Sequence, residues 1–434
     1  MKKVFKVISL LFIMILAVPL FVACGETPPP DGDDGGLTPP PASPTGISYL
    51  FVPEEDSEDE GAHYIVSGIG DCSDKDIVIK SSIYNEDLGE TFPVTKIGGN
   101  AFWRCDGIET VVLPDTITKI ENSAFEECAN LRAINIPNSL TSIGFYSFYK
   151  CESLQSITLG QSVSIVKACA FEDCVSLKTA TILSPSVTMG DGVFSGCINL
   201  EEIVGSEAIR TIGDYAFCGC DNLKSFTFNN SIISIGDYAF SGCDNIESIV
   251  VPDSVKIIGD EAFSDCDKLV SVKLGKSITS IGKCIFSWSA ILAKDEYWIN
   301  NAFYLDNYLI YAEGCSGVYT IKEGTKCIAN YAFFNNENEF TELIIPDSVK
   351  YIGERAFGYC RQLEKVVIGE FVEFIGEKAF EECSSLEIAI FEDSEDWKAN
   401  NDDIDSEMLG NNGYAADYLT SQYVNYSWRK LLVA

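Results

Sequence analysis

Residues 97–119 read IGGNAFWRCDGIETVVLPDTITK, and this unit decides the fold because it repeats with a period of 23 residues. The shared pattern is Ile-Gly-x-x-Ala-Phe-x-x-Cys-x-x-Leu-x-x-Ile-x-Leu-Pro. Nine consecutive copies begin at Ile97, Ile120, Ile143, Val166, Met189, Ile212, Ile235, Ile258 and Ile281, and three more begin at Ile328, Ile352 and Ile375. A fixed period of this length is typical of a solenoid, in which each turn of chain packs against its neighbours.

Two rows of side chains follow from the repeat. The sixth position is phenylalanine in all twelve copies, from Phe102 to Phe380, which predicts a continuous stack of buried rings. The ninth position is cysteine in ten copies: Cys105, Cys128, Cys151, Cys174, Cys197, Cys220, Cys243, Cys266, Cys360 and Cys383. Parallel side chains on successive turns do not fit the dihedral angle of a disulfide, so buried free thiols are predicted in preference to a disulfide chain or a metal wire. Outside this row, a local disulfide between Cys315 and Cys327 is left open.

The end of each repeat reads as a short strand. In Leu131–Pro137 apolar and polar residues alternate before the proline, which is typical of a half-buried strand. Strands from stacked turns would join into a parallel sheet along one face. The Ile-Gly-x-x-Ala-Phe segment is predicted to form a short helical or 3-10 turn on the opposite wall.

These repeats resemble the BspA-like, treponemal-type leucine-rich repeats of bacterial surface proteins. The resemblance implies a leucine-rich-repeat solenoid, a right-handed coil of ~23-residue repeats with a parallel β-sheet on one face and short helical or 3-10 turns on the other. It also implies an N-terminal cap over 47–96, repeats over 97–391 with a degenerate turn at about 288–318, and a C-terminal capping module over 392–434. Caps are needed because a bare terminal turn would expose the core and an unpaired sheet edge.

The first 46 residues predict export and lipid attachment. Lys2 and Lys3 give a positive start, an apolar run follows, and Phe21-Val22-Ala23-Cys24 closes a lipoprotein signal peptide over 1–23, with lipid on Cys24. Residues 24–46 are rich in Pro, Gly and Asp, which predicts an extended stalk. An uncleaved membrane helix is the alternative. The predicted location is the extracellular face of the bacterial cell envelope, with a lipid anchor in the membrane.

Composition narrows the function classes. The net charge of −35 disfavours a nucleic-acid partner. The chain has one histidine, His63, expected to be a solvated surface residue, so a multi-histidine zinc site is excluded and no catalytic residue is predicted. Loop acids such as Asp214, Asp237 and Asp260 suit calcium, but no EF-hand or RTX loop accompanies them. The chain is therefore predicted not to be an enzyme and to carry no metal or cofactor.

The candidate binding surface is the outward side of the sheet. Its sixteenth-position row contains mostly neutral, β-branched residues, and the candidate binding residues are Asn135, Thr158, Thr181, Thr227 and Lys273. Ordinary strand composition is the alternative explanation of this row. The BspA-like resemblance implies adhesion: a monomer that binds a host or neighbouring-cell surface or matrix protein, or a glycan. A glycan-processing lipoprotein with paired carboxylates and a non-binding spacer are the alternatives.

The aromatic residues of the degenerate turn have two interpretations. Trp288, Tyr297, Trp298, Phe303, Tyr304, Tyr308 and Tyr311 are mainly expected in the core. Any of them left exposed could anchor a protein partner or stack on a sugar.

Overall fold

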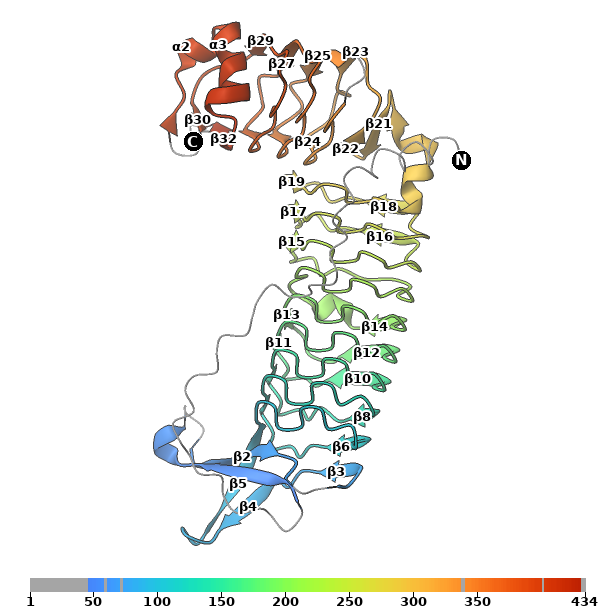
Figure 1. The fold of residues 1–434 in the computed structure, drawn as a ribbon, viewed down its shortest axis with the longest axis vertical. Helices are drawn as coiled ribbons and strands as arrows, with labels where there is room; N and C mark the ends of the chain where they lie inside the picture. Colours follow the sequence, from blue (N-terminus) through green and yellow to red (C-terminus); the bar gives the residue numbers. More distant parts are fainter. Residues whose placement is uncertain (1–45, 58–60, 71–72, 337–339, 400–401, 431–434) are drawn as a thin grey trace. The chain divides into compact units, whose positions relative to one another are not determined.

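A computed structural model describes residues 46–57, 61–70, 73–336, 340–399 and 402–430. The predicted signal peptide and the lipidation site Cys24 lie outside these residues. The chain divides into two compact units: a first unit of Met1–Ile249 with Asp265–Leu269, and a second unit of Val250–Ser264 with Val270–Ala434. Each unit is a stack of similar turns (Figure 1), which confirms the leucine-rich-repeat solenoid.

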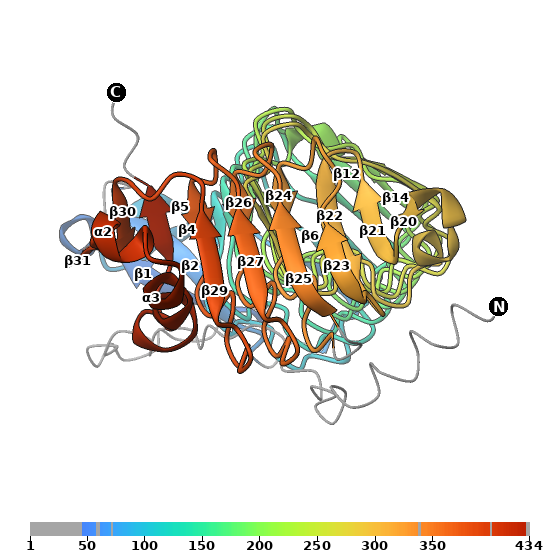
Figure 2. The same cartoon turned by 90° about the horizontal axis from the view of Figure 1, so that it is seen from above.

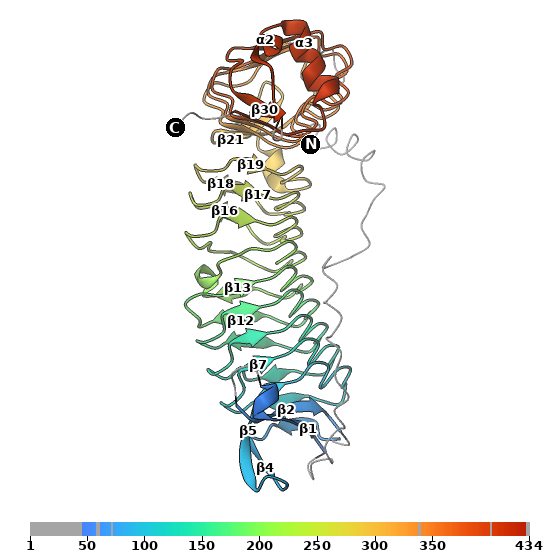
Figure 3. The same ribbon diagram turned by 90° about the vertical axis from the view of Figure 1, so that its left-hand side faces the viewer.

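The first unit opens with a small β cap. Strand β1 pairs antiparallel with β2, β2 pairs in parallel with β5, and β4 and β5 form an antiparallel hairpin, seen at the end of this unit in Figure 3. Because β5 also pairs in parallel with the first strand of the repeats, the cap covers the open end of the core. Its elements are β1 (Ser48–Val52), the 3-10 helix η1 (Glu54–Asp56), β2 (His63–Gly68), β3 (Asp76–Val78), β4 (Ser82–Asn85) and β5 (Glu90–Ile97).

Every regular turn contributes to two walls. The first wall is the predicted parallel sheet, with strands in the orders β3-β6-β8 and β10-β12-β14. The second wall contains two-residue strands, which follow β5 in the order β7-β9-β11-β13. We call the outward side of the first wall the strand face and the second wall the turn wall. The bounds are β6 (Thr110–Val112), β8 (Ala133–Ile134), β10 (Ser156–Leu159), β12 (Thr179–Ile182), β14 (Glu202–Val204), β7 (Lys119–Ile120), β9 (Ser142–Ile143), β11 (Ile165–Val166), β13 (Thr188–Met189), the 3-10 helix η2 (Ser206–Ala208) and β15 (Ser234–Ile235).

After each short strand, the turn wall continues into a single tight turn. The amide of Cys105 donates to the carbonyl of Phe102, an i+3 to i bond of the 3-10 type, but no continuous helix follows. Asn100 and Arg104 adopt left-handed φ values of 56° and 57°. Their amides then point along the coil and donate to carbonyls of the next turn, at 3.0 and 2.8 Å. These inter-turn bonds offset the cost of left-handed backbone at residues other than glycine.

Glycine at the second repeat position brings the backbones of successive turns close together. A Cβ on Gly236 would lie 2.5 Å from the backbone of Asp214, and one on Gly144 would lie 2.6 Å from that of Asn122. Neither contact can be relieved by a rotamer change, because the opposing atoms belong to the backbone. Nine of the twelve copies have glycine at this position, and the others have Glu121, Lys167 and Ala329, so glycine allows the closest approach of the turns without being required in every copy.

The core contains the two predicted rows. The rings of Phe102, Phe125 and Phe148 stack at centroid distances of 5.0 and 5.3 Å, and the stack continues through the first unit to Phe240. All ten ninth-position cysteines are free thiols. The thiol of Cys151 donates to the carbonyl of Phe125 at 3.2 Å, and the same bond recurs in the following turns. The thiols thus pair with the backbone of the preceding turn instead of with each other.

The second unit repeats this arrangement around an irregular insertion. The degenerate turn holds the antiparallel strands β20, β21 and β22, and β22 then pairs in parallel with β24, so the turn wall continues. Cys315 and Cys327 are both free thiols, so the disulfide left open for them does not form. The elements are β16 (Ser248–Val250), β17 (Ile257–Ile258), β18 (Ser271–Lys273), β19 (Ser280–Ile281), η3 (Ala290–Ala293), η4 (Asp295–Tyr297), β20 (Trp298–Ile299), β21 (Ala302–Leu305), β22 (Tyr308–Ala312) and β24 (Cys327–Ile328).

The last part of the second unit is regular and then closed by a cap. Figure 2 shows β23, β25, β27 and β29 side by side. Helix α3 packs against β29, and β32 pairs with β28 and β30. The bounds are β23 (Gly317–Thr320), β25 (Phe340–Ile345), β26 (Tyr351–Ile352), β27 (Lys365–Ile368), β28 (Phe374–Ile375), β29 (Ile388–Phe391), β30 (Trp397–Ala399), β31 (Asp402–Asp403), α2 (Ser406–Leu409), α3 (Asn412–Asp417), the π-helix η5 (Tyr418–Gln422) and β32 (Trp428–Lys430). Among the described residues, no helix combines the length and the apolar character that a membrane span needs.

Candidate functional site

The predicted binding residues lie on the strand face, but only some of them are neighbours. Thr158 and Thr181 lie opposite each other in adjacent parallel strands, β10 and β12. Asn135 and Thr227 belong to other turns of the first unit, and Lys273 belongs to β18 of the second unit. All except the half-buried Thr181 are exposed. The strand face of the first unit therefore offers a row of contacts from separate turns.

Although Asn135 is exposed, its side chain is hydrogen-bonded to the backbone of the preceding turn. Strand β8 ends after two residues, and the Asn135 side chain continues its hydrogen bonding. The amide oxygen accepts from the backbone N–H of Leu113 at 2.7 Å, and the amide nitrogen donates to the carbonyl of Leu113 at 2.8 Å. Both ends of the amide are thus occupied within the sheet, which leaves Thr158 and Thr181 as the freer members of the row.

Several charges on the strand face of the first unit are paired across strands. Glu109 binds Lys75 at 2.6 Å and Arg132 at 3.6 Å, and Glu201 pairs with Lys224. The bond with Lys75 lowers the pKa of the Glu109 carboxyl. These exposed pairs contribute little to stability. They do make this face nearly neutral in a chain whose net charge is −35.

The strand face of the second unit is more apolar than the sequence row indicated. Val318 is 61% exposed and Ile388 is 39% exposed. Between them, in register, lie Glu342 and Lys365, whose side chains form an ion pair at 2.8 Å. The row beside it contains Ile344, Val367 and Ile390, all half-buried. Val367 and Ile390 hold the sixteenth position of the repeats that begin at Ile352 and Ile375. Ile344 is displaced by one position because the repeat that begins at Ile328 has 24 residues.

The loop acids considered as calcium ligands accept hydrogen bonds from backbone amides. The Asp191 carboxylate accepts the amide N–H of Asp214 at 2.9 Å, and Asp214 accepts that of Asp237 at 2.8 Å. Asp260 does the same for Lys283 and also pairs with its ammonium group at 3.6 Å. Across the residues that the structure covers, no group of three or more His, Cys, Asp or Glu side chains could hold a metal ion.

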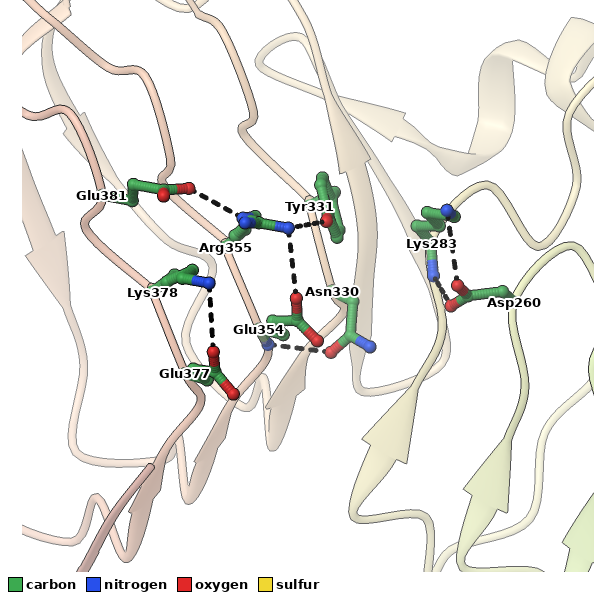
Figure 4. Close-up of polar contacts among 9 residues, drawn as sticks. All are labelled: Asp260, Lys283, Asn330, Tyr331, Glu354, Arg355, Glu377, Lys378 and Glu381. Atoms are coloured by element: carbon green, nitrogen blue, oxygen red, sulfur yellow. Dashed lines mark hydrogen bonds and ion pairs between the residues drawn. The ribbon is translucent and has the colours of Figure 1, made fainter. Parts of the chain in front are cut away.

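The turn wall of the second unit carries the polar network shown in Figure 4. Arg355 donates to Glu381 at 2.7 Å and to the Tyr331 hydroxyl at 2.6 Å, and it lies 3.5 Å from Glu354. The amide of Glu354 in turn donates to the side chain of Asn330. Bonds to Tyr331 and Glu381 raise the pKa of the Arg355 guanidinium. The network ties successive turns together and leaves this cation with few free donors.

Several carboxyl groups of the first unit have a raised pKa. Burial raises the pKa of Glu172 to about 7, and its Oε2 atom has no hydrogen-bond partner. Burial also raises the pKa of its neighbour Asp173. Burial and mutual repulsion raise the pKa of Asp244, which lies near Asp267. Burial is the largest cause in each case, and none of these groups is set against a positioned partner as an acid and base pair would be.

His63 and the aromatic residues of the insertion complete the predicted candidates. His63 is 1% exposed, so the expected surface position is wrong: in β2 its ring is covered, and Nδ1 lies 2.8 Å from the Gly61 carbonyl. Phe303, Tyr304 and Tyr308 are buried, as expected for core residues. Trp288 is 42% exposed at a left-handed φ of 64°. It is the exposed aromatic residue that the sequence interpretation allowed for.

Comparisons with known proteins agree with the repeat solenoid described above. A family model described as a BspA type leucine rich repeat region, in six copies, matches residues 89–201, 187–313 and 307–402. A leucine-rich repeat protein from Bacteroides ovatus is 26% identical, with a TM-score of 0.51, over 82% of this chain and 88% of that one. A leucine rich cell surface protein from Faecalibacterium prausnitzii is 22% identical, with a TM-score of 0.42, over 82% and 96%. No curated protein matches the sequence.

Proposed function

Because the chain belongs to the BspA-type leucine-rich repeat family, we propose that it is a bacterial surface protein that binds other proteins through its strand face. Binding, and not catalysis, is its proposed activity. The observation that carries the proposal is the contrast between the two walls. The turn wall uses its polar groups for bonds between turns, as with Asp214 and Arg355. The strand face also pairs charges between turns, as with Glu109 and Lys75, but beside these pairs it presents exposed neutral side chains such as Thr158 and Val318.

The proposed biological role is adhesion to a host or neighbouring-cell surface or matrix protein. The support is the family, together with the cell-surface description of the relative from Faecalibacterium prausnitzii. The proposed attachment is a lipid on Cys24, which follows the export signal in the sequence. A surface solenoid with a neutral contact face and an acidic body would bind by shape and apolar contact while remaining soluble.

The test is a binding array of matrix proteins, host-cell surface proteins and glycans, probed with the purified chain. We expect reproducible binding to at least one protein, with affinity lowered at least tenfold when Thr158 and Thr181 are both changed to Lys or when Val318 is changed to Lys. The matched control is Lys167→Glu, an exposed change on the turn wall. Binding to glycans alone, or equal losses in all three variants, would contradict the proposal.

The lipid anchor has its own test. Export of the chain in a bacterial host should place it in the membrane fraction, and Cys24→Ala should release it into the soluble fraction. Unchanged membrane association of the Cys24→Ala variant would show that another feature anchors the chain.

A further inference from the structure

The strand face of the second unit contains an aliphatic surface, which we call the apolar strip. It consists of two rows in register across β23, β25, β27 and β29. The residues are Val318, Glu342, Lys365 and Ile388 in one row and Thr320, Ile344, Val367 and Ile390 in the other. Five of the eight are aliphatic, and none of these five is fully buried. A cluster of this kind on a sheet face is an unusual exposure of large apolar side chains.

The two charges inside the apolar strip cancel each other. Glu342 and Lys365 are cross-strand neighbours, and their side chains meet at 2.8 Å. Both are only about one-third exposed, at 27% and 34% of the side-chain surface. The pair therefore adds no net charge to the strip, and a partner could cover it without bringing a charge of its own to this point.

Uncompensated acids border the apolar strip on two sides. On one side Glu364 and Glu387 directly precede β27 and β29, and both are exposed. On the other side lie Asp347, Glu370 and Glu392, also exposed. These carboxyl groups lie close enough to interact, because a hydrogen bond with Asp347 raises the pKa of Glu392. We call these two groups the acidic rims.

An exposed aromatic residue adjoins one rim. Phe371 follows Glu370 directly and is 55% exposed. Burying an aromatic ring of this kind is a large source of binding energy at protein interfaces, and such anchors tend to lie beside apolar surface.

We propose that the apolar strip with its acidic rims docks an extended protein segment that is apolar in its middle and basic at both ends. This proposal rests on the proposed protein-binding function and specifies its partner. The rims lie about six residues apart along a strand, so the basic groups of the partner should be separated by roughly 20 Å. Apolar contact supplies most of the affinity, and the rims attract and orient the basic ends.

The charge of the chain argues against a second copy as the occupant. Two copies placed face to face would bring acidic rims together, in a chain that already carries a net charge of −35. Like charges opposed in this way disfavour association.

The test uses the full chain and three fluorescent peptides of ten residues in anisotropy titrations. The probe is Lys-Lys-Thr-Val-Thr-Val-Thr-Val-Lys-Lys. One control replaces its lysines with glutamates, and the other replaces its valines with serines. We expect the probe to bind at least tenfold more tightly than either control, and its affinity to fall as NaCl rises. Equal binding of the glutamate peptide would overturn the charge argument, and equal binding of the serine peptide would overturn the role of the apolar strip.

Variants locate the binding site. Val318→Lys combined with Ile388→Lys changes two exposed residues and should lower probe affinity at least tenfold. The matched control is Val112→Lys, a 49% exposed position on the strand face of the first unit, which should leave affinity unchanged. Glu364→Gln combined with Glu387→Gln should weaken binding at low salt and flatten its salt dependence. Equal losses from Val112→Lys and the double lysine variant would overturn the assignment to this strip.

The outcomes separate this proposal from the proposed function. If the chain binds proteins in the array, but the double lysine variant binds them as well as the parent chain, the function stands and the docking site is wrong. If analytical ultracentrifugation shows a dimer that the double lysine variant abolishes, the occupant is a second copy, which also overturns the proposal.

Discussion

Glu172 is the residue whose environment makes the clearest prediction about pH. Its side chain is 5% exposed, and burial raises its pKa from 4.5 to about 7. Below pH 4.5 the carboxyl is protonated in both the folded and the unfolded chain; above pH 7 the folded chain must bury its charge. The free energy of unfolding should therefore fall as pH rises through this window, by up to about 3 kcal/mol.

Glu172→Gln should remove this dependence. We expect the variant to be more stable than the parent chain at pH 8 and close to it at pH 4.5, as measured by thermal unfolding across that range. The matched control is Glu126→Gln, at the same repeat position two turns earlier, where the side chain is only half-buried. A parent chain and Glu172→Gln variant that differ by the same amount at every pH would contradict the assignment.

At the scale of the element, the tight turn depends on close backbone approach. Gly236→Ala would place Cβ 2.5 Å from the backbone of Asp214 and should lower stability by roughly 2–3 kcal/mol. Because long repeat arrays unfold in parts, hydrogen exchange of amides near residue 236 is the better measurement. The control is Gly107→Ala, whose Cβ meets nothing within 4 Å, and it should change protection little. Equal loss of protection in both variants would show that helix or turn propensity, and not contact, governs this position.

The elements also show what the sequence could predict. The repeat predicts the phenylalanine stack and the free thiols because both depend only on translation from one turn to the next, as with Phe125 and Cys151. It could not predict the amide bonds of Asn135, which depend on β8 ending early. The apolar strip was missed for a related reason. Val318 lies in the degenerate turn, where the repeat pattern assigns no outward position, and outward residues are free to vary without a cost in packing.

For the whole molecule, the balance between net charge and ion pairs predicts the effect of salt. The chain has 65 acidic and 30 basic residues, so one-to-one pairing would still leave 35 acidic residues without a basic partner. Ion pairs such as Arg104 with Glu127 are exposed and contribute little to stability. Screening should therefore relieve more repulsion than attraction, and Tm should rise by several degrees between 20 and 300 mM NaCl. Sodium sulfate would also strengthen apolar burial, so NaCl is the proper salt for calorimetry. A fall in Tm over this range would mean that the ion pairs between turns, including that of Arg355 with Glu381, hold the coil together more strongly than its net charge opposes it.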